Sequence, residues 1–169
     1  MIFKKKHNHD LYNTLLHLSR NIFFYKKINL PDSFETRIYL MFIHFSIMMI
    51  IFKKKGKKFS QESYDALFNN IEYNLREMGY GDVAVNKKMK DLNKLLYDIL
   101  LKIEKTKDNK FKINEKLIFK YFGELKLNDN VNYFKLEEYL INFYDFCFDI
   151  SPDSMIRGAL EFGENYGST

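Results

Sequence analysis

Apolar residues recur along this chain every three or four positions, the spacing of one face of an α-helix. The pattern is clearest between Ser60 and Gly79. Six apolar residues of this stretch fall within an arc of about 100° on a helix: Tyr64, Leu67, Phe68, Ile71, Leu75 and Met78. Gly79 accepts the left-handed backbone that commonly ends a helix. The stretch is therefore predicted to be an amphipathic helix with one buried face.

The same spacing predicts five other helices, at residues 10–27, 32–53, 86–105, 114–122 and 132–149. Asp10 is the expected N-cap of the first. The apolar face of this first helix is formed by four residues at helical spacing: Leu11, Leu15, Leu18 and Ile22. Asp32 stands three residues before Glu35, the spacing of a capping box, so the second helix is expected to begin there.

Few residues interrupt these helical patterns. Pro occurs at two of the 169 positions and Gly at seven, and no Asn-Gly turn joins two alternating apolar runs. The predicted fold class is therefore all-α, a single compact bundle of about six helices. We divide the chain into a basic N-terminal extension at residues 1–9, a helical domain at residues 10–150 and a C-terminal tail at residues 151–169 that packs on the domain.

The second predicted helix contains a nearly unbroken apolar run from Ile38 to Phe52. Fifteen residues at 1.5 Å each extend about 22 Å, which is short of the ~30 Å of hydrocarbon that a spanning helix must cross. His44 and Ser46 also interrupt the run. A central core helix is the favoured interpretation, and a single membrane span at residues 38–52 is the alternative.

Positive charge is concentrated in the first part of the chain. Residues 1–60 carry 12 Lys and Arg against 3 Asp and Glu, whereas residues 113–169 carry 5 against 10. This asymmetry favours docking on an anionic surface or partner. Five lysines follow the apolar run and are candidate contacts with anionic lipid or RNA phosphates, with a solvated loop as the alternative: Lys53, Lys54, Lys55, Lys57 and Lys58.

Residues for catalysis are sparse. The four histidines show no metal-ligand spacing, and Cys147 lies between two phenylalanines, which is typical of a small core residue rather than a nucleophile. Gly79 and Gly81 lie between two predicted helices, whereas a phosphate-binding loop normally follows a strand. We therefore expect a protein that is not an enzyme and that uses no metal and no cofactor.

The centre of the chain contains a distinctive run, Leu75-Arg76-Glu77-Met78-Gly79-Tyr80-Gly81-Asp82. It is preceded by the run from Leu30 to Ser33, by Arg37 and by His44 within the apolar helix. In these residues and their order the chain resembles the ubiquinol-cytochrome c chaperone family. The resemblance covers residues 10–105, with a further similar segment from Ile156 to Phe162.

The resemblance implies an all-helical, non-enzymatic assembly factor for the ubiquinol-cytochrome c reductase complex. Such a protein would bind newly made cytochrome b or an early complex III intermediate, with a small helical partner protein and with contacts to the membrane surface or the ribosome. Residues 1–10 lack the apolar run of a secretory leader. We therefore expect a cytoplasmic protein, peripheral at the inner face of the membrane, or on the matrix side if it is organellar. An RNA- or ribosome-binding helical module is the alternative function.

Seven residues of the resembling block are the candidate partner-binding residues: Arg37, His44, Arg76, Gly81, Asp82, Lys87 and Lys88. Lys87 and Lys88 would present positive charge to an acidic loop, and Asp82 would either cap a helix or accept a partner cation. For Gly81 the structural alternative is a turn requirement, and for His44 it is a hydrogen-bonded core position.

Overall fold

The computed structural model describes residues 2–105, 110–126 and 130–167. Short helical turns follow α1, α5 and α6, namely η1 (Phe23–Lys27), η2 (Gly123–Lys126) and η3 (Pro152–Ser154). Within the described residues the only β-type pairing is one isolated bridge, between Glu104 and Ile113. The all-α prediction is confirmed, with these α-helices: α1 (Ile2–Ser19), α2 (Phe34–Lys54), α3 (Gln61–Glu77), α4 (Asp82–Lys102), α5 (Glu115–Tyr121), α6 (Val131–Phe148) and α7 (Met155–Asn165).

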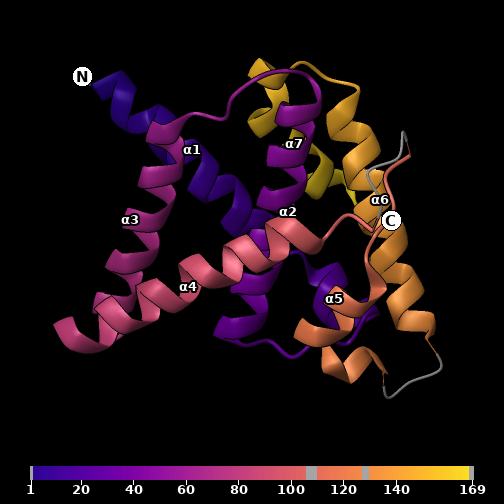
Figure 1. Ribbon diagram of the computed structural model, residues 1–169, viewed down its shortest axis with the longest axis horizontal. Coiled ribbons are helices and arrows are strands. Elements are labelled where there is room, and N and C mark those ends of the chain that lie inside the picture. The colour runs from indigo at the N-terminus through magenta and orange to yellow at the C-terminus, as the bar shows by residue number, and fades with distance from the viewer. Residues whose placement is uncertain (1, 106–109, 127–129, 168–169) are drawn as a thin grey trace.

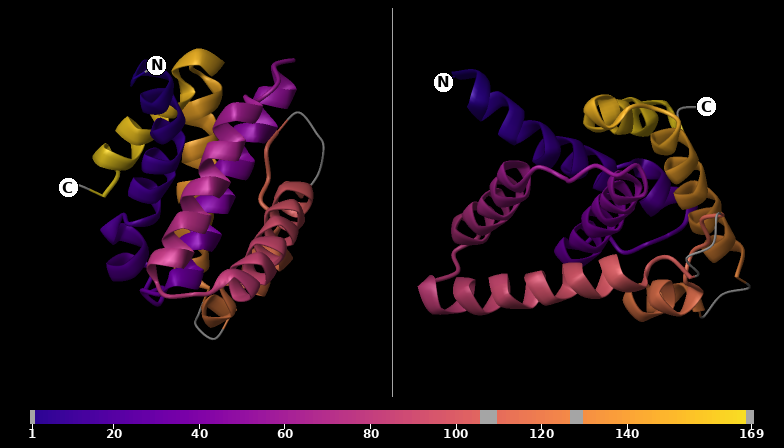
Figure 2. Two further views of the ribbon diagram at one scale, coloured as in Figure 1. Left: turned by 90° about the vertical axis from the view of Figure 1, so that its left-hand side faces the viewer. Right: turned by 45° about the horizontal axis from the view of Figure 1, so that its top comes forward.

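The apolar helix α2 lies at the centre of the fold. It packs against α1, α4 and α6, and Figures 1 and 2 show these helices on different sides of it. Its length and composition would allow it to cross a membrane, but 67% of its apolar window is buried among the other helices. This burial favours the core helix over the membrane span that the sequence also allowed, because the apolar side chains already have protein neighbours.

The first helix differs from its predicted bounds at both ends. It begins at Ile2, so Asp10 lies within the helix and is not its N-cap, and it ends at Ser19 rather than at Lys27. The early end has a local cause, because the side chain of Asn21 accepts a hydrogen bond from the Phe23 backbone N–H at 3.0 Å. Ile22 therefore lies beyond the helix and is 58% exposed, whereas Leu11, Leu15 and Leu18 are buried as predicted.

The helix starts also differ from the predicted caps. Ser33, and not Asp32, is the N-cap of α2, and its hydroxyl accepts a hydrogen bond from the Thr36 N–H. Asp32 instead pairs with Arg37. The helix α4 begins at Asp82, four residues before its predicted start. Ser60 is the N-cap of α3, and its hydroxyl accepts a hydrogen bond from the Ser63 N–H. This confirms the predicted start of that helix.

The C-terminal segment forms a seventh helix, α7, that packs on α1 and α6 (Figure 2). Gly163 is buried where a β-carbon would lie 2.6 Å from the Leu18 Cδ2 atom, so the glycine allows α7 to approach α1 closely. Gly158 and Gly163 also explain why sequence propensity did not predict this helix, because glycine is a poor helix former.

Candidate partner-binding site

The turn between α3 and α4 brings the central sequence run to one corner of the molecule. Gly79 has φ +97°, a left-handed conformation that ends α3, as predicted. Gly81 is the N-cap of α4 with φ −79°, and a β-carbon there would meet no atom within 4 Å. The turn therefore requires glycine at position 79 but not at position 81. The turn requirement suggested for Gly81 is wrong.

This difference predicts opposite effects of one substitution at the two glycines. Gly79→Ser is expected to lower the free energy of unfolding by about 1–2 kcal/mol, because a side chain disfavours the left-handed conformation. Gly81→Ser is expected to raise it by a few tenths of a kcal/mol, because serine is a better N-cap than glycine. Urea denaturation of the two variants tests this, and a larger loss for Gly81→Ser would contradict the turn geometry.

An ion pair spans the same turn. Arg76 Nη1 donates to Asp82 Oδ1, and the two side chains are 44% and 83% exposed. Asp82 is the first residue of α4 rather than its cap, so its carboxylate interacts favourably with the helix N-terminus and accepts a cation of its own chain. Both side chains remain accessible to a binding partner.

A cavity of about 310 Å³ opens beside this turn, between α2, α3 and α4. Its walls are mainly apolar, and the charged groups Glu35, Lys88 and Asp91 lie among them. Met78 and Tyr80 also line it and are 54% and 37% exposed. The other lining residues come from all three helices: Phe34, Ile38, Tyr39, Leu75, Leu92 and Leu95. Such a cavity can accept one or two apolar side chains of a partner segment, with polar contacts around them.

The two candidate lysines lie along the first turns of α4. The Lys88 ammonium is 4.6 Å from the centroid of the Tyr80 ring, a cation–π contact at the edge of the cavity. Lys87 is exposed and has no ion pair within the described part of the chain. Of the seven candidate residues, the structure thus places five together at this corner: Arg76, Gly81, Asp82, Lys87 and Lys88.

Arg37 is placed away from this corner group. Its Nη2 atom donates to Asp32 Oδ1 at 2.6 Å, at the N-terminal end of α2. Its pKa is raised: burial would lower it, but the hydrogen bonds with Asp32 and Tyr25 outweigh burial. The carboxylate that pairs with Arg37 is thus five residues away in the sequence. The side chain is still 38% exposed.

His44 lies in the core, with no exposed surface. Its Nδ1 atom is 2.6 Å from the Leu40 carbonyl oxygen, which can only accept, so Nδ1 donates. Its Nε2 atom then accepts from the Tyr139 hydroxyl at 2.7 Å. Burial lowers the pKa of His44 to about 4, so the ring is neutral. The geometry supports the core interpretation of His44. A binding partner would not contact the ring directly and would affect it only by changing how α2 packs on α6, where Tyr139 lies.

The lysine cluster that follows the apolar run divides into two groups. Lys54 forms an ion pair with Glu104 at 2.5 Å and donates to the Tyr144 hydroxyl at 3.1 Å. Lys55 donates to the Ile150 carbonyl oxygen at 2.7 Å. These two lysines hold the end of α2 to neighbouring segments, which leaves Lys53, Lys57 and Lys58 exposed. Of the five lysines predicted to contact an anionic surface, Lys53, Lys57 and Lys58 thus form no ion pair within the described residues.

The described residues contain no group of three or more His, Cys, Asp or Glu side chains that could hold a metal ion. Cys147 is buried, as predicted, and burial raises the pKa of its thiol to about 12. The thiol is therefore protonated at neutral pH and a poor nucleophile.

Most of the cavity residues could not be predicted from the sequence, because they lie on helices that are far apart in the chain. The one available signal was Met78, which follows the buried stripe of α3 but stands at its C-cap, directly before Gly79. Met78 is 54% exposed, whereas Leu75 before it on the same stripe is buried.

Comparisons with known proteins agree with this picture. No curated protein and no solved structure matches the chain. A family model described as ubiquinol-cytochrome C chaperone matches residues 26–117, which include α2, α3, α4 and the whole cavity at their corner. Because the match covers more than half of the 169 residues, the chain belongs to the ubiquinol-cytochrome C chaperone family.

Proposed function

We propose that this protein is an assembly chaperone for the ubiquinol-cytochrome c reductase complex and that it binds newly made cytochrome b or an early complex III intermediate. The observation that carries the proposal is that the family match includes the accessible corner of α2, α3 and α4. A chaperone needs a surface that holds its client without chemistry. The family membership likewise supports a role that is not enzymatic.

The corner offers two complementary kinds of contact. Met78 and Tyr80 provide exposed apolar surface beside the cavity. Lys87 and Lys88 add positive charge on the adjacent turn of α4. An apolar segment of an unassembled membrane protein would place a side chain in the cavity, and an acidic loop next to that segment would pair with the lysines.

We also propose a cellular location and a partner protein. The protein acts at the inner face of the cytoplasmic membrane, or on the matrix side in an organelle, as a peripheral protein near newly inserted clients. A small helical partner protein binds beside the client. The exposed apolar residues of α4, Val83 (86% exposed) and Leu101 (78% exposed), provide further surface for such a partner.

The double variant Lys87→Glu/Lys88→Glu is expected to reduce the recovery of cytochrome b with the purified protein at least about tenfold, because two favourable charge contacts become repulsive. The measurement is affinity purification from gently solubilised membranes, scored for cytochrome b and for a small helical companion. The helical content of the variant is expected to be unchanged, because Lys87 is exposed and Lys88 lies at the open cavity, so neither substitution removes a side chain from the core.

The matched control is Lys112→Glu/Lys116→Glu, which makes the same charge change at two exposed lysines near α5. It is expected to recover cytochrome b as the unmodified protein does. Equal losses in both double variants would show a general charge effect and would remove the α3–α4 corner from the client site. Normal cytochrome b levels in a strain that lacks the protein would count against the chaperone function itself.

The same preparations discriminate the two alternatives. An RNA-binding module would bind RNA with an affinity that falls steeply with salt, because bound counterions are released. A single-span protein would resist alkaline carbonate extraction, whereas a peripheral chaperone would be released.

A further inference from the structure

A second open groove lies on the molecule outside the α3–α4 corner. It has a volume of about 610 Å³ and lies between η1, α6 and the residues that follow α7. Its apolar lining comes from Ile22, Phe23 and Tyr166, and its charged lining consists of Lys26, Lys27 and Lys135. Four of these six residues lie outside the family match, namely Ile22, Phe23, Lys135 and Tyr166. Most of the groove is therefore formed by segments that the family match does not include.

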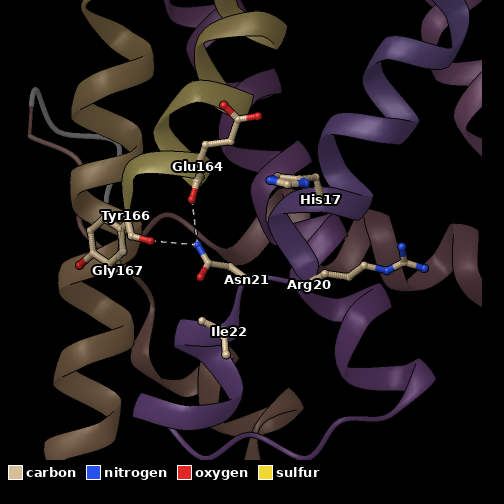
Figure 3. Close-up of a pocket in the computed structure, with 8 residues that line it drawn as sticks. His17, Arg20, Asn21, Ile22, Glu164, Tyr166 and Gly167 are labelled. Atoms are coloured by element: carbon tan, nitrogen blue, oxygen red, sulfur yellow. Dashed lines mark hydrogen bonds between the residues drawn. The ribbon is translucent and has the colours of Figure 1, made fainter. Parts of the chain in front are cut away.

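The fold fixes the shape of this groove through Asn21. Its Nδ2 atom donates to the Gly163 carbonyl oxygen at 3.1 Å and to the Tyr166 carbonyl oxygen at 3.4 Å. Figure 3 shows this side chain joining the end of α1 to the end of α7, with Ile22 next to it. Phe23 packs edge-on against Tyr166, with ring centroids 5.0 Å apart. One side of the groove is thus formed by contacts between the residue after the end of α1, η1 and the end of α7. These contacts do not need a bound ligand.

The rim of the groove carries unpaired positive charge. Lys26, Lys27 and Lys135 are all exposed, and within the described residues none of them forms an ion pair. Lys135 Nζ is within 3.5 Å of the Lys27 carbonyl oxygen, which places the lysines of η1 and α6 side by side. Glu138, one turn beyond Lys135 on α6, is the nearby acidic residue. The rim therefore has a net positive charge.

Exposed apolar residues extend the groove on both sides. Ile22 is 58% exposed on the η1 side, and Val131 and Phe134 are 55% and 58% exposed on α6. Val131 is four residues before Lys135 and three before Phe134, so it neighbours both side chains on the surface of α6. Basic side chains surrounding exposed aliphatic and aromatic groups are typical of a surface that rests at the boundary of a bilayer.

We propose that this groove binds the surface of a membrane that contains anionic phospholipids. The lysines contact the phosphate groups, and Ile22 and Phe134 enter the boundary between headgroups and acyl chains. Ile22 favours an acidic lipid over a nucleic acid, because an exposed aliphatic side chain enters the bilayer boundary but offers a base no ring on which to stack. The ring of Phe23 already stacks on Tyr139.

The first test is flotation of the purified full chain with phosphatidylcholine vesicles, with and without phosphatidylglycerol. Binding is expected only to the anionic vesicles. Neutralising one lysine near such a surface weakens binding about fivefold, so Lys26→Gln/Lys27→Gln/Lys135→Gln is expected to bind about a hundredfold more weakly. The control Lys90→Gln/Lys94→Gln/Lys112→Gln, with the same net charge and with all three lysines exposed, is expected to bind as the unmodified chain does. Equal weakening in both variants, or no binding by the unmodified chain, would overturn the proposal.

The second test uses the absence of tryptophan from the sequence. Ile22→Trp places a single fluorescent reporter at the groove, and Leu101→Trp places one at an exposed position of α4. Anionic vesicles are expected to shift the emission of the first to the blue and to leave the second unchanged. A shift at both positions, or a response of Ile22→Trp to RNA or to an acidic peptide instead of vesicles, would overturn the proposal. No cytochrome b is present, so either result is independent of the proposed chaperone function.

Discussion

Phe143→Ala is expected to lower the free energy of unfolding by about 3–5 kcal/mol, which is a large part of the roughly 5–15 kcal/mol of a typical domain. Phe143 lies on α6 and is fully buried. The centroid of its ring lies 4.8 Å from that of His44 on α2 and 5.5 Å from that of Phe162 on α7. Removing the ring leaves a cavity where three helices meet, and the surrounding side chains cannot all move to fill it.

The matched control is Phe134→Ala on the same helix. Phe134 is 58% exposed, so its truncation is expected to change the free energy of unfolding by less than about 1 kcal/mol. Urea denaturation of both variants, followed by circular dichroism, gives the comparison. Similar losses in the two variants would show that α6 does not connect α2 with α7 as the structure describes.

The buried faces of the helices could be predicted from the sequence because burial repeats with the helical period. In α3, Leu67, Ile71 and Leu75 are buried, and in α1, Leu11, Leu15 and Leu18 are buried, all on the predicted stripes. This information is local: each stripe is visible within its own segment, whatever the neighbouring helices are. The same periodicity predicted the fold class.

Helix ends were predicted less well, because one side-chain hydrogen bond decides between alternatives of similar energy. The spacing of Leu18 and Ile22 continues the apolar stripe of α1 past Ser19. The Asn21 side chain nevertheless stops the helix by bonding to the Phe23 N–H. The exposure of Ile22, and with it the lysine-rimmed groove, follows from this one interaction, which periodicity does not reveal.

The candidate site was predictable only where its residues are close in sequence. Arg76, Asp82 and Lys88 are brought together by a single turn, so the run that carries the family resemblance also forms the corner. Phe34 and Leu95 also line the cavity, but their meeting depends on how α2 packs on α4. No local pattern encodes that packing angle.

Lowering the pH from about 6.5 to about 4 is expected to cost about 3 kcal/mol of folding stability through His44 alone. In the unfolded chain the ring takes up a proton near pH 6.5, whereas in the folded protein burial lowers the pKa to about 4. Unfolding therefore takes up a proton within this window, and stability falls as the pH falls. Above about pH 6.5 the ring is neutral in both states, and this dependence disappears.

Two variants separate the titration of His44 from the acid titration of the surface carboxylates. Tyr139→Phe removes the hydroxyl that donates to Nε2 and is expected to cost about 1–3 kcal/mol at pH 7, because it leaves a buried acceptor unpaired. It keeps the histidine and therefore keeps the steep pH dependence. The double variant His44→Leu/Tyr139→Phe removes both polar groups, so it is expected to be more stable at pH 5 than Tyr139→Phe.

The decisive quantity is the slope of the unfolding free energy against pH between about pH 6.5 and 4, measured by urea denaturation. The slope is expected to flatten in the double variant and to persist in Tyr139→Phe, because only the double variant lacks the buried ring that must gain a proton. An unchanged slope in the double variant would mean that the carboxylates cause the whole acid sensitivity. In that case His44 would not be buried and neutral in the folded state, and the packing of α2 on α6 through Tyr139 would be wrong.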